Sequence, residues 1–268
     1  MKEVGSLKYG VLFKKAFCDP EVFRAFVKDF LDIEIKTDRI ETEKSLTPPV
    51  GKVDVKFDIF AEDRENRIIV DIQHVRHPDH YHRFLYYHCV ALVEAVASSG
   101  DYRPDVQVYT LVVLTSGDRH KKDICVTHFD PEDSDGNRLG EVSHKIIHIC
   151  PKYAGDRTPE RCREWMLAID DSMDGLVDES RYSRPEIRKV FGLIEKDLIT
   201  PQEYAAMKDE HSFQLIYDEK YQKGVEKGRK EGVEDTAANL LALGALSHEQ
   251  IAQATGLSPE EIRKLSLL

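Results

Sequence analysis

The sequence predicts an α/β fold in which a mixed sheet is flanked by helices and followed by a C-terminal helical appendage. Three observations predict it: an amphipathic helical pattern near the N-terminus, alternating apolar and polar runs between residues 40 and 73, and a long helical pattern followed by a nearly continuous apolar run over 106–114. A strand, a long helix and a buried strand in this order are typical of a βαβ crossover. We therefore expect parallel strands in the sheet.

Length and composition are those of a globular protein. The 268 residues allow one full-sized domain with an appendage, or two modest domains. The composition, 41% hydrophobic and 32% charged, excludes collagen-like, coiled-coil and wholly disordered chains. No apolar run approaches the ~18 residues of a membrane helix, and the N-terminus lacks the apolar stretch of a signal peptide. We expect a soluble, cytoplasmic protein with no membrane partner.

Cysteines and charge restrict the function further. The five cysteines are an odd number without CxxC spacing, which argues against a disulfide framework and against a zinc ribbon. The 38 basic and 49 acidic residues give a net charge of −11, which repels nucleic acid unless basic residues gather on one face.

Two short helices are expected between Val11 and Leu31. Asp19, Pro20 and Glu21 are an N-cap, a first-turn proline and a first-turn acid for the second of them. Six apolar residues then recur on one helical face, at positions 22, 23, 26, 27, 30 and 31. This helix should pack on the core.

Three extended runs follow as a meander of strands. They cover Ile40–Leu46, Val53–Ala61 and Arg67–Gln73, and the second alternates apolar with charged residues. We expect antiparallel pairing between consecutive runs because the connections are short.

The crossover comes next. His80–Ser98 has aromatic and aliphatic residues at helical spacing and stops at Gly100, and Val106–Leu114 is an apolar strand of buried, parallel type. Ile124–Phe129 and Lys145–Ile149 are expected to add edge strands.

From Arg161 onward the pattern is helical. We divide the chain into an α/β domain over residues 1–160, a helical extension over 161–220 and a helical tail over 221–268. The tail contains Gly224, Gly228 and Gly232, which lie on one side of a charged helix.

The end of the tail predicts two short helices joined by a tight turn. Ser247 with Gln250, and Ser258 with Glu261, have capping-box spacing, and Gly256 between them fits a helix end. The pair resembles a helix-turn-helix that reads DNA. The two acids that lead the second helix favour the other interpretation, a hairpin for packing or for homo-oligomer formation.

The hairpin between residues 53 and 73 carries the most informative polar residues. If Asp63–Asn66 is a four-residue loop, Asp58 and Asp71 lie directly opposite each other, with Cβ atoms roughly 4.5–5.5 Å apart. Two opposed carboxylates repel each other unless they share a proton or bind a divalent cation such as Mg²⁺.

Two further polar residues extend this face. Strand alternation places Gln73 on the same face as Asp71, and the same register places Lys56 opposite Gln73. Two acids, an amide and an ammonium are the layout of a metal-assisted hydrolase. The alternative is a solvated hairpin with scattered charge. An unpaired Asp71 among isoleucines and valine would be costly, however.

Nearly the whole sequence resembles a known family. The order of helix, three-strand meander with D…(D/E)xK or (D/E)xQ, helix and strand looks like the PD-(D/E)XK nucleases. More closely, it resembles the recombination-promoting nuclease and putative transposase family in the following motifs: FDIFAED, IIVDIQ, HRFLYYH, SSGDYRPDVQVYTLVVL and LLALGALSHEQIAQATGLSPEEI. Phe13 and Lys14 match the family's opening helix, although Gly10 stands where the family has an aspartate.

The resemblance implies a PD-(D/E)XK core and specific residue roles. Asp58 and Asp71 would be metal ligands, the Ile72 carbonyl a further ligand, and Gln73 would take the place of the lysine. The implied activity is a Mg²⁺-dependent DNA endonuclease, with Mn²⁺ as a substitute, in recombination or mobile DNA. The alternative is a weak or inactive DNA-associated regulatory protein that keeps the nuclease fold.

Four histidines follow the hairpin. His74, His77, His80 and His82 have the pattern HxxHxH, which can be read as a zinc-ligand run. The spacing matches no standard structural site, and Pro78 separates a strand end from a helix start. Histidines that are solvated or that touch substrate are the other interpretation.

Basic and aromatic residues accompany them. Arg76 and Arg83, with Tyr86 and Tyr87, are candidates for contacts with a phosphate backbone. Helical aromatics more often belong to the core, with their hydroxyls satisfied.

Overall fold

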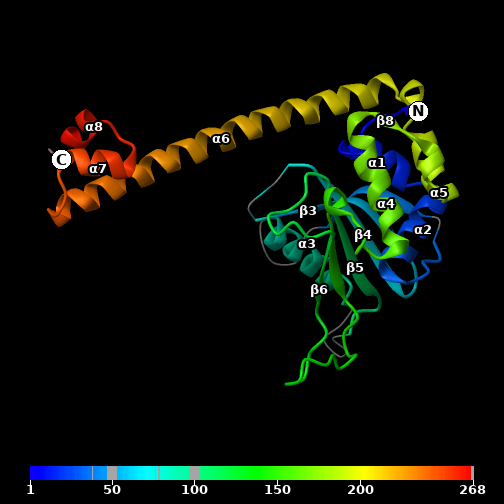
Figure 1. Ribbon diagram of the computed structural model, residues 1–268. Helices are drawn as coiled ribbons and strands as arrows, with labels where there is room; N and C mark the ends of the chain where they lie inside the picture. The colour runs from blue at the N-terminus through cyan, green and yellow to red at the C-terminus, as the bar shows by residue number, and fades with distance from the viewer. Residues whose placement is uncertain (38, 47–52, 76, 78, 97–102, 267–268) are drawn as a thin grey trace. The chain divides into compact units, whose positions relative to one another are not determined.

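The chain folds into two compact units, Met1–Asp209 and Glu210–Leu268 (Figure 1). The computed structural model describes residues 1–37, 39–46, 53–75, 77, 79–96 and 103–266. The first unit holds a six-stranded mixed sheet flanked by helices, and the second is helical. The mixed α/β architecture with C-terminal helices is therefore confirmed. Within the described residues, no helix has both the length and the apolar character needed to cross a membrane.

The large sheet has the strand order β2-β3-β4-β5-β7-β6. The β2, β3 and β4 strands form the predicted antiparallel meander, β5 lies parallel to β4 and β7, and β6 is antiparallel to β7. Their bounds are Ile40–Leu46 for β2, Val55–Glu62 for β3, Asn66–Gln73 for β4, Gln107–Leu114 for β5, Ile124–His128 for β6 and Lys145–Ile149 for β7.

The expectation that both late strands lie at an edge is wrong for β7. Of these two strands only β6 lies at an edge of the sheet, and β7 lies between β6 and β5. The sequence of β7 explains this, because Ile146, Ile147 and Ile149 are all buried and cover both of its faces.

The predicted crossover is present as β4, α3 and β5. Helix α3 covers His80–Glu94 and joins two parallel strands. It ends before the predicted Ser98, and the predicted stop at Gly100 lies outside the described residues. On its face of the sheet, Val90 and Ala91 of α3 share a core cluster with Phe57, Phe60 and Ile69.

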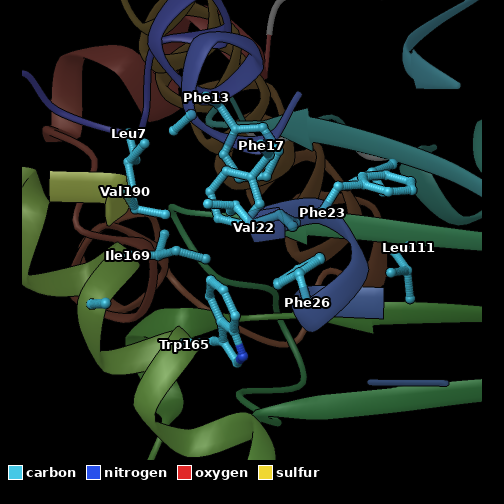
Figure 2. Close-up of a cluster of buried hydrophobic side chains, with 14 of the residues drawn as sticks. Leu7, Phe13, Phe17, Val22, Phe23, Phe26, Leu111, Trp165, Ile169 and Val190 are labelled. Atoms are coloured by element: carbon cyan, nitrogen blue, oxygen red, sulfur yellow. The ribbon is translucent and has the colours of Figure 1, made fainter. Parts of the chain in front are cut away.

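Four helices cover the opposite face (Figure 1). Aromatic packing forms the centre of this core: the Phe13 and Phe17 rings stack with centroids 4.1 Å apart, and Phe26 meets Trp165 edge-on at 5.4 Å (Figure 2). The helices are α1 (Gly10–Phe17), α2 (Pro20–Leu31), α4 (Glu160–Asp171) and α5 (Pro185–Leu193).

Local signals in the sequence set the start of α2. The Asp19 side chain accepts hydrogen bonds from the backbone N–H groups of Glu21 and Val22, at 3.0 and 3.2 Å. The predicted N-cap is confirmed. The sequence did not predict a small second sheet, in which β1 (Lys2–Glu3) pairs with β8 (Leu176–Val177).

The second unit comprises the C-terminal part of α6 (Pro201–Leu243), α7 (His248–Thr255) and α8 (Pro259–Leu265). Both predicted capping boxes are present, at Ser247 and Ser258, and Gly256 ends α7 with a φ of 76°. A small apolar core closes the unit, made of Ala237, Ile251, Ala252 and Ile262.

Candidate active site

Strands β3 and β4 separate at the two predicted acids. The strands pair from Glu62 opposite Arg67 to Ile59 opposite Val70, which is the predicted register. Beyond this point β3 continues only with β2, and β4 continues only with β5. We call the point of separation the fork; it is defined by Asp58 on β3 and by Asp71 on β4.

The two acids bridge the fork reciprocally. Asp71 Oδ1 accepts a hydrogen bond from the backbone N–H of Asp58 at 3.0 Å. In turn, Asp58 Oδ2 accepts one from the N–H of Ile72, also at 3.0 Å. The carboxylates thus satisfy backbone donors that strand pairing no longer satisfies. The structure therefore brings Asp58 and Asp71 together through these hydrogen bonds, although the predicted direct strand pair between them is not formed.

Two acceptor atoms at the fork are buried and have no hydrogen-bond partner. They are Asp71 Oδ2 and Gln73 Oε1. Asp71 is 4% exposed, and the Gln73 amide nitrogen is fixed because it donates to the Val75 carbonyl at 2.7 Å. Residues two apart on a strand share a face, so both side chains lie on one face of β4. Because an unpaired buried acceptor is costly, this site suits a cation or a hydrogen-bond donor.

The Ile72 backbone contributes a third oxygen. Its N–H donates to Asp58, so this side of the Ile72 backbone faces the fork rather than β5. In a strand the N–H and C=O of one residue point to the same side, so the Ile72 carbonyl also faces the fork. Carboxylate, amide and carbonyl oxygens are ligands that Mg²⁺ binds, so the fork residues fit such an ion.

Burial and mutual repulsion change the acidity of the pair. Burial, followed by the charge of Asp58, raises the pKa of Asp71 to about 8, while the positive charges of Arg83 and Lys14 oppose this rise. Burial also raises the pKa of Asp58. The pair without a cation therefore keeps a proton near neutral pH, and binding of a cation would release it.

Lys14 is a site residue that strand reasoning missed. Its Nζ lies 3.6 Å from Asp58 Oδ1 and also forms an ion pair with Glu43 of β2. The backbone of Glu43 has a φ of 57°, which residues other than glycine rarely adopt. Glu43 lies between the β2–β3 strand pairs Thr42–Ile59 and Lys44–Phe57. The only sequence signal was the match of Phe13 and Lys14 to the opening helix of the family.

The expectation for Lys56 is wrong. Lys56 lies opposite Ser45 of β2 rather than opposite Gln73, and its ammonium forms an ion pair with Glu43. Its side chain is 60% exposed. The physical reason is the fork: β3 has already left β4 where Lys56 would have met Gln73.

The histidines do not converge on one centre. His74 Nδ1 lies 2.8 Å from the Thr115 hydroxyl, whereas His80 Nδ1 lies 2.8 Å from the His77 carbonyl and its Nε2 lies 3.4 Å from Asp118. Across the described part of the chain, no three His, Cys, Asp or Glu side chains form a metal-binding group. The zinc interpretation of the HxxHxH run gains no support.

The aromatic residues of α3 serve mainly in packing. Tyr87 meets the Phe57 ring edge-on, and the Tyr86 hydroxyl donates to the Val53 carbonyl at 2.9 Å. The Arg83 guanidinium lies over the Tyr87 ring, 5.2 Å from its centroid. Arg76 and Pro78 lie outside the described residues.

Comparison with protein-family models, with curated proteins and with solved structures finds no match for this chain. Its function is therefore inferred from the fork residues and from the motifs in the sequence.

Proposed function

We propose that this protein is a metal-dependent DNA endonuclease with a PD-(D/E)XK type of core. Asp58, Asp71 and the Ile72 carbonyl would hold Mg²⁺, and Mn²⁺ could take its place. The observation that supports this most is the acid pair at the fork together with two buried oxygens, Asp71 Oδ2 and Gln73 Oε1, that have no hydrogen-bond partner.

The fork residues have distinct tasks in this proposal. When bound, Mg²⁺ supplies polarisation of the phosphate and lowers the pKa of a bound water. Asp71 gives up its proton when the ion binds, and Asp58 keeps the two strands in place through Ile72. Gln73 accepts a hydrogen bond from the attacking water at Oε1, since its nitrogen is already held by Val75.

Three further features support DNA as the substrate. The motifs that resemble the nuclease family run over most of the chain. The order α2, the β2–β3–β4 meander, α3 and β5 agrees with the element order that this resemblance implies. A lysine, Lys14, lies beside the acids although the whole chain carries a net charge of −11. A local cation can bind a phosphate despite overall repulsion.

The test is nicking of supercoiled plasmid by purified protein with Mg²⁺, with Mn²⁺ and with EDTA. Asp58→Asn and Asp71→Asn should each abolish nicking, because each removes a ligand charge. Asp54→Asn is the matched control, because Asp54 is an exposed acid just before β3 and should retain activity.

Three results would count against the proposal or change it. Full activity of the Asp71→Asn protein would refute the assignment to the fork. Nicking that persists in EDTA would refute metal dependence. Metal binding without any nicking would favour the alternative, a DNA-associated regulatory protein that keeps the fold.

A further inference from the structure

The proposed site has no cation on β4. Gln73 is neutral, and the negative charge that grows on a phosphate during hydrolysis needs a nearby positive group or hydrogen-bond donor. Among the residues that the structure describes, three cations lie near the acid pair: Lys14 on α1, Lys56 on β3 and Arg83 on α3. Their contacts distinguish them.

Lys14 is held at the fork by the packing of α1. Its neighbour Phe13 is fully buried in the core that also contains Ile59 of β3 and Val70 of β4, which holds the helix on the sheet. The ammonium lies 3.6 Å from Asp58 Oδ1, the carboxylate oxygen that does not accept from Ile72. Its charge favours the ionised form of both acids.

The other two cations are directed elsewhere. Lys56 is 60% exposed and pairs with Glu43, on the outer side of the ion-pair chain that runs from Asp58 through Lys14 to Glu43. Arg83 lies over the Tyr87 ring, and its Nε is 3.4 Å from the Tyr87 hydroxyl. Lys14 is therefore the cation whose Nζ is directed at an acid of the fork.

We propose that Lys14 contacts the scissile phosphate and supplies the positive charge that Gln73 lacks. This inference rests on the proposed function. In the reaction, the oxygen of water bonds to phosphorus and the bond from phosphorus to one sugar oxygen breaks. One water proton passes to solvent, and the released sugar oxygen takes a proton from solvent. Lys14 keeps its own protons and donates a hydrogen bond to a non-bridging phosphate oxygen.

The chain offers a matched control on the same helix. Lys15 is exposed to the same degree as Lys14, 23% against 21% for the side chains, but it pairs with Glu203 and donates to the Leu198 carbonyl. Lys14→Met and Lys15→Met therefore remove equal charges from α1, and only the first removes a charge at the fork. Lys14→Arg keeps the charge.

Two measurements on the full chain separate the roles. The first is the nicking rate at saturating Mg²⁺, which should fall by ~10² in Lys14→Met and recover in part in Lys14→Arg. The second is binding of a short DNA duplex in Ca²⁺ as a function of salt. A lost phosphate contact should lower the slope of log K against log [salt] by about one. Lys15→Met should change neither quantity.

The outcomes distinguish failure of this inference from failure of the proposed function. Suppose that the wild type nicks DNA and that Lys14→Met nicks it at a rate within about threefold, with the same salt slope. This result would overturn the role of Lys14 and leave the proposed function standing. A reduced slope in a protein that does not nick would support the phosphate contact and overturn the catalytic function. A wild-type protein that neither nicks nor binds DNA would overturn both.

Discussion

Replacement of Asp71 by asparagine should stabilise the protein at alkaline pH when no metal is present. Asparagine has the shape of aspartic acid, and its Oδ1 can still accept the hydrogen bond from Asp58 N–H. It removes the buried negative charge and its repulsion with Asp58. The aspartate is thus a cost to stability that a bound cation would offset.

The pKa of Asp71 sets the sign and size of this effect. Because burial and Asp58 raise the pKa from 3.8 to about 8, the folded state keeps a proton that the unfolded state has already lost. The stability that this proton contributes is complete below about pH 4 and is lost as the pH rises towards 8. At ~1.4 kcal/mol per pKa unit, the limit is about 6 kcal/mol. Even a third of that limit, about 2 kcal/mol, would raise Tm by about 4–8 °C.

The assay is thermal unfolding of both proteins in EDTA at pH 4.5 and at pH 8.5. We expect a higher Tm for Asp71→Asn at pH 8.5 and nearly equal values at pH 4.5. Added Mg²⁺ at pH 8.5 should stabilise the wild type, since it binds the folded state only, and should leave the variant unchanged. Equal Tm values at both pH values would refute the buried, like-charged pair on which the candidate site depends.

Three other predictions concern regions outside the fork. His88 is fully buried beside the Thr110 hydroxyl, and burial, followed by the charge of His144, lowers its pKa to about 3. The free energy of unfolding of the wild type should therefore fall by about 2 kcal/mol between pH 7.5 and pH 5, and that of His88→Asn should not show this fall. Parallel pH profiles of the two proteins in urea unfolding would contradict this. A chain ending at Asp218 should keep the melting transition of the first unit, because that unit ends at Asp209; loss of cooperative unfolding would show that the tail completes its core. Ser258→Ala should cost about 1 kcal/mol through loss of the capping box of α8, seen as faster amide exchange in that helix; unchanged exchange would remove the cap as a cause of its stability.

Much of the local structure was determined by the sequence because its causes lie within a few residues. The N-cap at Asp19, the capping boxes at Ser247 and Ser258, and the hairpin register from Glu62 to Ile59 all depend on short-range geometry. The closeness of Asp58 and Asp71 follows from that register, because both residues come directly after its last pair, so two of the site residues could be placed from the sequence.

Only the tertiary structure decided which residues surround that pair. Beyond the fork β3 pairs with β2 and β4 pairs with β5, but β3 and β4 no longer pair with each other, so Lys56 does not meet Gln73. The place of Lys14 depends on aromatic packing of α1 against α2 and against α4, which lies more than a hundred residues further along the chain. The interior place of β7 likewise follows from burial on both faces. Such contacts leave no periodic pattern in the sequence, because they form between surfaces that meet only after the chain has folded.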